Sequence, residues 1–230
     1  MLFFSRRAAA AAGLCALALA GCGSSSHADT STAAAAAVPA AGGASYSPVS
    51  SVATSKQTVS RPKRHVPRSL MLVGDSLGVG ISPLLQSGLA GWNVKTDDLV
   101  GRPLATGMAI WRQRTTRPGV AAFSLFTNDD PRALSSLRSA VRETLRDQKG
   151  RCVIWATIHR APVGGVSYTA ANQLLKRMAA RNPKRLKIVD WAGAVAKSPS
   201  LIGPDGVHGT AAGYATRARM YENAARSCVS

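Results

Sequence analysis

Short apolar runs alternate with amphipathic segments along the chain from residue 70 onward. Runs typical of buried strands occupy residues 70–73, 92–96, 120–126, 152–158 and 186–191. Between them, and after the last, lie segments with the apolar spacing of a helix face, over residues 82–89, 104–112, 131–149, 168–181 and 211–227. Repeated alternation of strand and helix predicts parallel pairing with helical crossovers. We therefore expect an α/β protein, a three-layer α/β/α sandwich around a five-stranded, mainly parallel sheet.

The first strand runs into a segment rich in glycine. Residues 70–73 lead directly to the tripeptide Gly74-Asp75-Ser76, and the next helix signal is Ser82 followed by Pro83. The pattern predicts a strand, a sharp turn, and a helix capped by Ser82. Open α/β folds place their sites at the carboxyl edge of the sheet, so Ser76 is a candidate nucleophile. Gly, Asp and Ser are also ordinary turn residues, which is the alternative.

The first 22 residues have the pattern of an export signal. Arg6 and Arg7 precede a small and apolar stretch over residues 8–20, which is too short to span a bilayer stably. The stretch ends in Leu19-Ala20-Gly21-Cys22, which resembles the lipobox of bacterial lipoproteins. That resemblance implies cleavage before Cys22 and lipidation of its thiol and new amino group. A plain signal peptide with a chance cysteine is the alternative.

The next segment differs in composition from everything after it. Residues 22–68 are rich in Ala, Ser, Gly and Pro and carry few large apolar side chains, so they cannot bury enough surface to offset chain entropy. We therefore expect a signal peptide over 1–21, a lipidated and disordered tether over 22–68, and one folded domain over 69–230. The predicted location is extracytoplasmic, with the protein anchored to the bacterial membrane as a lipoprotein.

The charge of the chain is strongly positive. Its 29 Lys and Arg against 11 Asp and Glu give a formal net charge of +18. Seven of these basic residues and one acidic residue precede residue 69, so most of the charge belongs to the predicted domain. Such a surface suits nucleic acid, anionic lipid or anionic wall polymer. We expect no nucleic-acid partner, because the sequence has no nucleic-acid-binding signature and carries an export signal. A solvated arginine-rich surface without a partner is the alternative.

The chain has four cysteines, of which two remain after the N-terminal region is set aside. Cys15 lies in the signal segment and Cys22 is the proposed lipid site. Cys152 and Cys228 are therefore candidates for a disulfide in an oxidising compartment. Two unpaired buried thiols are the alternative.

A serine hydroxyl becomes a useful nucleophile when a base accepts its proton and a carboxylate orients that base. Of the four histidines, His27 and His65 lie in the predicted tether. His208 stands in a glycine-rich loop before the last helix, three residues after Asp205, a spacing that lets the carboxylate face Nδ1. His159 ends a predicted strand and is a weaker candidate for the same edge of the sheet.

Acyl transfer also needs donors for the oxygen that becomes negative at the tetrahedral stage. The backbone N–H groups of Ser76 and Gly101 and the side-chain amide of Asn128 are candidates, because all three follow predicted strands. Turn formation or helix capping is the alternative role of each.

Four blocks carry a family resemblance: Gly74-Asp75-Ser76, Gly101, Thr127-Asn128-Asp129 and the segment from Asp205 to His208. In this order they resemble the sequence blocks of the SGNH (GDSL) hydrolases, over the chain from about residue 70 to its end. The resemblance implies a flavodoxin-like fold, Ser76 as nucleophile, His208 as base, Asp205 as its orienting acid, and an oxyanion hole of Ser76, Gly101 and Asn128. Nothing in the sequence suggests a metal or an organic cofactor, so we expect none.

Two further segments, residues 100–102 and 188–191, are more similar to the extracellular SGNH domains of bacterial peptidoglycan O-acetyltransferases than to secreted lipases. One position departs from the family pattern. The family has glycine two residues before the asparagine, where this chain has Phe126. A bulky side chain there is expected to narrow the pocket or to displace Asn128.

Together these features predict an extracytoplasmic serine esterase or acyltransferase. The expected substrate is an acyl ester, with a small acyl group such as acetyl cleaved from or transferred to a cell-envelope glycan. The alternative is a catalytically silent lipoprotein on the same fold that binds cell wall or anionic lipid through its basic surface.

Overall fold

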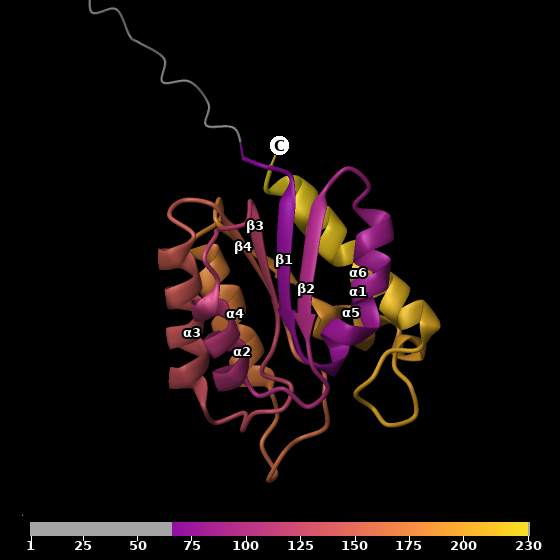
Figure 1. Ribbon diagram of the computed structural model, residues 1–230. Helices are drawn as coiled ribbons and strands as arrows, with labels where there is room; N and C mark the ends of the chain where they lie inside the picture. Colours follow the sequence, from indigo (N-terminus) through magenta and orange to yellow (C-terminus); the bar gives the residue numbers. More distant parts are fainter. Residues whose placement is uncertain (1–65, 230) are drawn as a thin grey trace, which may run out of the picture. The chain divides into compact units, whose positions relative to one another are not determined.

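The computed structural model describes residues 66–229 (Figure 1). Cys22, the predicted signal peptide and almost all of the predicted tether lie outside the described residues. Five strands form one sheet in the order β2-β1-β3-β4-β5, and every neighbouring pair is parallel. The strands are β1 (Ser69–Gly74), β2 (Asn93–Asp98), β3 (Val120–Ser124), β4 (Cys152–Ala156) and β5 (Leu186–Val189).

Helices cover both faces of this sheet (Figure 1). One face carries α2 (Leu104–Gln113), α3 (Leu134–Asp147) and α4 (Thr169–Ala180). The other carries α1 (Ser76–Gly88), α5 (Trp191–Lys197) and α6 (Ala211–Ser227), with a short 3-10 helix, η1 (Pro199–Leu201), before α6. The predicted three-layer α/β/α sandwich is therefore confirmed, and the sheet is parallel throughout.

The core consists of two apolar layers, one on each face of the sheet. Every residue of β3 and β4 is buried, which explains why these strands are continuous apolar runs in the sequence. Beneath α2 and α3, Phe123 stacks on Trp155 with ring centroids 4.7 Å apart, and Trp111 meets Phe123 edge-on. Trp191 and Tyr221 are the largest apolar side chains of the opposite layer.

The first helix begins earlier than the sequence predicted. It starts at Ser76, with Asp75 as its N-cap, so the expected start at Ser82 was wrong and Pro83 lies inside the helix. The glycines of this segment lie inside the helix, where they allow close packing against neighbouring elements. A Cβ on Gly78 would clash with the Asp98 carboxylate, and one on Gly80 would clash with the Tyr214 ring. Close approach to neighbouring elements, and not turn formation, explains these glycines.

Other boundaries also differ from the sequence prediction: β3 and β4 each end two residues earlier than expected, and β2 lies at Asn93–Asp98 in place of residues 92–96. The fifth strand ends at Val189, because Asp190 accepts a hydrogen bond from the Gly193 amide and starts the short helix α5, which was not predicted. Helix α3 begins at Leu134, since residues 131 and 132 form a turn. Neither of these last two changes moves the carboxyl edge of the sheet.

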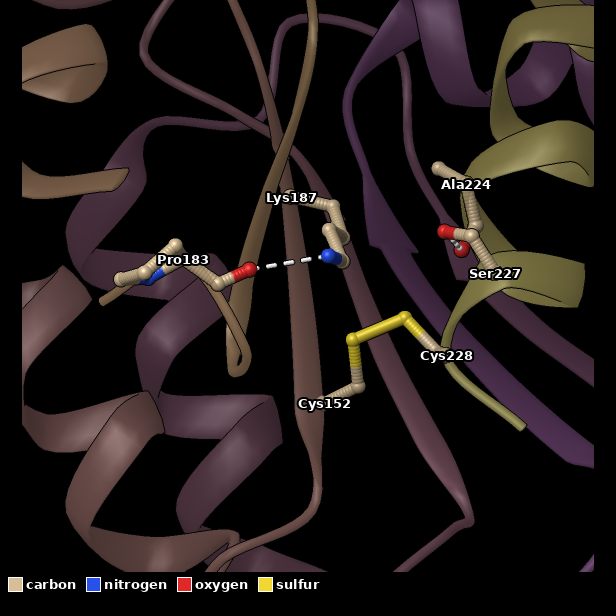
Figure 2. Close-up of a disulfide and its surroundings, with 6 residues drawn as sticks. All are labelled: Cys152, Pro183, Lys187, Ala224, Ser227 and Cys228. Atoms are coloured by element: carbon tan, nitrogen blue, oxygen red, sulfur yellow. Dashed lines mark hydrogen bonds between the residues drawn. A yellow bond between two sulfur atoms is a disulfide. The ribbon is translucent and has the colours of Figure 1, made fainter. Parts of the chain in front are cut away.

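A disulfide joins the sheet to the last helix (Figure 2). Cys152, the first residue of β4, is bonded to Cys228, the C-cap of α6, and their Cα atoms are 5.7 Å apart. The bond closes a loop with a sequence separation of 76 residues. It therefore fixes the end of α6 to the amino edge of the sheet.

The helices of residues 66–229 include none that is long and apolar enough to cross a membrane.

Candidate active site

Ser76 is held at the junction between β1 and α1 by the residue before it. The Asp75 carboxylate accepts hydrogen bonds from the Leu77 amide at 3.0 Å and from the Ser124 hydroxyl at 3.3 Å. The Asp75 backbone amide donates to the Ser124 carbonyl at 2.8 Å. These bonds fix the turn to β3 and cap the new helix, so the Ser76 hydroxyl stands at the carboxyl edge of the sheet.

His208 is positioned by a compact loop between η1 and α6. The Gly203 amide donates to the His208 carbonyl at 2.8 Å, and Gly206 has the positive φ, +70°, that the turn requires. The Asp205 carboxylate accepts from the backbone amides of Val207 at 3.0 Å and His208 at 2.9 Å. The carboxylate therefore orders the loop as well as facing the imidazole ring.

Three side chains from opposite ends of the domain form one hydrogen-bonded relay. His208 Nε2 is 2.9 Å from Ser76 Oγ, and His208 Nδ1 is 2.5 Å from an Asp205 carboxylate oxygen. The His208 side chain is 44% exposed and that of Asp205 is 50% exposed, so the relay lies at an open surface. The hydrogen bond from His208, with those from the two backbone amides, holds the pKa of Asp205 below its usual range.

The charge of Asp205 determines how the imidazole is protonated. An ionised carboxylate beside Nδ1 favours the tautomer with hydrogen on Nδ1, which leaves the Nε2 lone pair facing Ser76. In that tautomer Ser76 donates to Nε2. The structure thus brings together the three residues that the sequence singled out for nucleophile, base and orienting acid, in the geometry that proton removal from a serine requires.

The candidate oxyanion donors follow three adjacent strands. Strand β1, which leads to Ser76, lies between β2, which leads to Gly101, and β3, which leads to Asn128. Within residues 66–229 the backbone amides of Ser76 and Gly101 donate to no protein acceptor. The Asn128 side-chain amide donates one hydrogen to the Arg102 carbonyl at 3.3 Å, which leaves its second hydrogen available. All three groups can therefore donate to a ligand.

Two acidic side chains hold the loops that carry these donors. Arg102, which is buried, donates to the Asp97 carboxylate at 2.6 Å. The Asp129 carboxylate accepts from the Leu104 amide at 2.9 Å and so joins the loop of Asn128 to the start of α2. Burial raises the pKa of Asp129. The two loops beside Ser76 are thus joined to each other by hydrogen bonds.

Phe126 adopts a backbone conformation that favours glycine, with φ of +83°. Its ring is fully buried and meets the ring of Tyr168 edge-on, with centroids 6.2 Å apart. The side chain therefore points into the core beneath α2, α3 and α4, and it lines no accessible surface beside Ser76. The backbone keeps the form that a glycine would adopt, and the residue contributes to packing.

Replacing Phe126 with glycine is expected to destabilise the domain by about 2–4 kcal/mol. The loss of a buried ring costs about 3–5 kcal/mol, and relief of the positive φ returns about 1 kcal/mol. Phe126→Ala is the matched control, because it removes the ring and keeps the strain; it should be less stable than Phe126→Gly by about 1 kcal/mol. Urea unfolding of the three proteins measures both differences. A glycine variant as stable as the parent would show that the ring contributes no net stability.

His159, the weaker histidine candidate, is not part of the relay. It is half-buried after β4, and burial lowers its pKa. No hydrogen bond described in residues 66–229 connects it to Ser76, Asp205 or His208. The neighbouring Arg160 donates to the Thr127 carbonyl at 2.7 Å and so supports the loop of Asn128.

A buried arginine beneath the relay was not predicted from the sequence. Arg217 of α6 is only 2% exposed and donates to the Ser124 hydroxyl at 3.0 Å, which in turn contacts Asp75. Burial raises the pKa of Asp75, and the charge of Arg217 opposes that rise. Arg217 therefore connects the helix after His208 to the turn that carries Ser76. Its position three residues after Tyr214, on the apolar face of α6, was the available signal.

Asp98, at the end of β2, is a second largely buried carboxylate near Ser76. It accepts a hydrogen bond from the Ser82 hydroxyl and lies against Gly74 and Gly78. Burial raises its pKa to about 6, although the Ser82 hydrogen bond opposes the rise. At neutral pH the Asp98 carboxylate is therefore ionised in the folded protein although its burial disfavours the charge.

We expect Asp98 to make the folded domain less stable as pH rises from about 4 to 6. The folded state holds the proton up to about pH 6, whereas the unfolded state releases it near pH 4. The stabilisation from this proton is fully present below about pH 4 and is lost as pH rises through the folded pKa, a change of about 3 kcal/mol. Urea unfolding at several pH values measures the unfolding free energies of the parent and of Asp98→Asn. Relative to Asp98→Asn, the parent should lose stability as pH rises from about 4 to 6. A difference independent of pH would contradict it.

Within residues 66–229 no cluster of three or more His, Cys, Asp or Glu side chains is placed to hold a metal ion.

No model of a known protein family and no curated protein sequence matches the chain. Several solved structures are similar to the chain in fold. The C-terminal catalytic domain of Streptococcus pneumoniae peptidoglycan O-acetyltransferase A, determined with a methylsulfonyl adduct, has a TM-score of 0.58 and 20% identity, covering 71% of this chain and 95% of that one. A lipase/acylhydrolase from Enterococcus faecalis has a TM-score of 0.57 and 17% identity, covering 69% and 96%. A GDSL-like lipase from Bacteroides thetaiotaomicron has a TM-score of 0.53 and 14% identity, covering 69% and 88%.

Proposed function

We propose that this chain, which has the fold of the SGNH (GDSL) hydrolases, is a serine esterase or acyltransferase. The single observation that carries the proposal is the unbroken hydrogen-bonded path from Ser76 through His208 to Asp205. Ser76 is far in the sequence from Asp205 and His208, and the side chains of the latter two are about half exposed, so core packing alone does not account for their meeting.

In the first half-reaction, Ser76 Oγ attacks the carbonyl carbon of the acyl ester. Its proton passes to His208 Nε2, which lies 2.9 Å away, and Asp205 stabilises the imidazolium that forms. The carbonyl oxygen becomes an oxyanion and accepts hydrogen bonds from the Ser76 and Gly101 amides and the Asn128 side chain. The bond to the leaving alcohol then breaks, His208 returns the proton to that alcohol, and the acyl group stays on Ser76.

In the second half-reaction, His208 removes a proton from the acceptor, whose oxygen attacks the acyl-enzyme. Water as acceptor gives hydrolysis and a free acid, and a sugar hydroxyl gives transfer. Ser76 regains its proton from His208, so the protein is unchanged after one cycle. The two outcomes share every protein group and differ only in which acceptor reaches the acyl carbon first.

The proposed substrate is a cell-envelope glycan that carries or receives a small acyl group such as acetyl. Four observations support it. The relay is open to solvent, so a long polymer can reach it. Beside Gly101, Leu99 and Val100 are 56% and 70% exposed and offer an apolar contact for a sugar ring. The fold resembles that of a peptidoglycan O-acetyltransferase domain. The N-terminal sequence has the pattern of an exported lipoprotein.

The nucleophile is tested by a fluorophosphonate, which forms a stable adduct with an activated serine. We expect the full-length protein to be labelled at Ser76, as read by peptide mass spectrometry. His208→Ala should lose the label while the fold is retained, because the base is then missing. A folded parent protein that takes no label and turns over no acetyl ester would instead support the silent, wall-binding alternative.

The substrate is tested with O-acetylated and de-acetylated peptidoglycan as separate probes. Release of acetate from the first indicates an esterase. Gain of acetyl groups by the second, with an acetyl ester as donor, indicates a transferase. Activity on small acetyl esters without activity on either polymer would contradict the glycan assignment and leave the serine mechanism in place.

We also propose that the protein is held at the outer face of the bacterial membrane through a lipid on Cys22. The support is the lipobox-like sequence before Cys22. Detergent phase partition of the protein produced in bacteria tests this: the parent should enter the detergent phase, and Cys22→Ala should stay in the aqueous phase. Equal partition of the two proteins would contradict the anchor.

A further inference from the structure

Helices α3 and α4 pack against each other with a groove between them that is walled by arginines on both sides. Its volume is about 510 Å³. Arg138 and Arg142 line it from α3, and Arg177 and Arg181 line it from the end of α4 and the residue after it. Buried apolar side chains, including Leu174 and Met178, form its floor. We call this feature the arginine groove.

Within residues 66–229 the four guanidinium groups have no acidic partner. The Arg177 guanidinium contacts the Gln173 side chain at 3.5 Å, and no side-chain hydrogen bond or ion pair is described there for Arg138, Arg142 or Arg181. All four side chains are exposed. On each wall the two arginines are one helical turn apart, a spacing at which like charges disfavour the helix.

The acidic residues of α3 lie elsewhere. Glu143 accepts both hydrogen bonds of the Arg112 guanidinium, at 2.7 Å each, and Asp147 accepts from the Trp111 indole at 3.3 Å. Both partners belong to α2, and α4 has no acidic residue. Positive charge is thus gathered on the walls of the groove and negative charge faces away from it. This separation leaves a concentrated positive field along the groove that no acidic side chain of the described part of the chain neutralises by an ion pair.

We propose that the arginine groove binds a single flexible polyanion, a linear polymer of phosphate or phosphodiester groups. Guanidinium forks match phosphate oxygens in geometry and charge. Arginines on each wall are about 6 Å apart along the helix, so a chain lying in the groove meets successive positive groups. The arginines stand on both walls of a single groove of about 510 Å³, so one extended chain lying in it meets positive groups on both sides.

This surface is separate from the relay and does not depend on acyl chemistry. Figure 1 shows α3 and α4 on one face of the sheet, whereas α1 and α6, which flank Ser76 and His208, cover the other. The groove therefore serves to hold the protein on a polymer and takes no part in the reaction. Its failure in a binding test would leave the proposed enzyme activity untouched, and the reverse also holds.

The test uses the full-length protein and fluorescently labelled inorganic polyphosphate, with affinity measured by fluorescence anisotropy. The variant is Arg142→Gln with Arg177→Gln, one from each wall. The matched control, Arg219→Gln with Arg226→Gln, removes the same charge from exposed positions of α6 on the opposite face. Far-ultraviolet circular dichroism and melting temperature verify that each protein is folded.

We expect the groove variant to bind at least tenfold more weakly at low salt, and the control to stay within twofold of the parent. The slope of log affinity against log salt should fall by about 1.4 in the groove variant, since each lost phosphate contact contributes about 0.7 for a single strand. Equal losses in the two variants, or no binding by the parent, would overturn the proposal. So would groove-dependent binding to anionic lipid vesicles or duplex DNA in place of polyphosphate.

Discussion

Ser76→Ala is expected to lower the turnover of an acetyl ester by about 10⁴–10⁶-fold. Ser76 Oγ is the only atom of the relay that forms a covalent bond to the acyl carbon. Without the Ser76 hydroxyl, His208 has no serine proton to remove. The fold should be unaffected, because the Ser76 hydroxyl makes its described hydrogen bond to His208 and helix α1 is capped by Asp75. Steady-state kinetics with p-nitrophenyl acetate measure the loss.

The matched control is Ser87→Ala, which removes a hydroxyl from the same helix at an exposed position. It should retain the activity of the parent. His208→Ala and the double variant Ser76→Ala with His208→Ala should be about as inactive as Ser76→Ala alone, because residues that act as a unit are not additive. A Ser76→Ala protein with activity near that of the parent would remove Ser76 as the nucleophile. A double variant much weaker than either single one would show that the two residues act separately.

Loss of the disulfide between Cys152 and Cys228 is expected to lower the free energy of unfolding by about 4 kcal/mol. The bond closes a loop with a sequence separation of 76 residues, and such a loop restricts the unfolded chain strongly in the chain-entropy description. Urea unfolding of the parent and of Cys152→Ala with Cys228→Ala measures the change. Adding a thiol reductant should lower the stability of the parent to near that of the variant and should leave the variant unchanged.

The disulfide should affect stability far more than chemistry. It fastens the C-terminal end of α6, whereas His208 precedes the N-terminal end of that helix, where Thr210 accepts from the Gly213 amide at 3.1 Å. Turnover at a temperature where both proteins are folded is therefore expected to stay within about threefold of the parent. Equal unfolding midpoints with and without reductant would contradict the stabilising role.

The order of the five strands and of helices α1 to α4 and α6, together with the residues of the relay, followed from the sequence. Strands β3 and β4 could be predicted because parallel strands buried on both faces require continuous apolar runs. Ser76 and His208 could be paired because each stands in a glycine-rich segment that a parallel sheet with its helices carries to the same edge. The two cysteines could be paired because only they remain in the predicted domain.

Other features depended on which groups pack together. The glycines after Ser76 signal a turn equally well, and only the structure shows that they lie in a helix packed against Asp98 and Tyr214. The direction of the Phe126 ring follows from its positive φ, which a one-dimensional pattern does not contain. Arg217 meets Ser124 only because α6 lies across β3.

The sequence by itself thus determined the fold class and the chemical groups that meet at the edge of the sheet, since periodicity and chain order fix which face and which end of an element a residue occupies. Tertiary structure alone decided the distances between those groups, the burial of Asp98 and Arg217, and the pairing of two arginine rows across α3 and α4. The physical reason is that distance, burial and charge density arise between elements, and no single segment of the chain contains them.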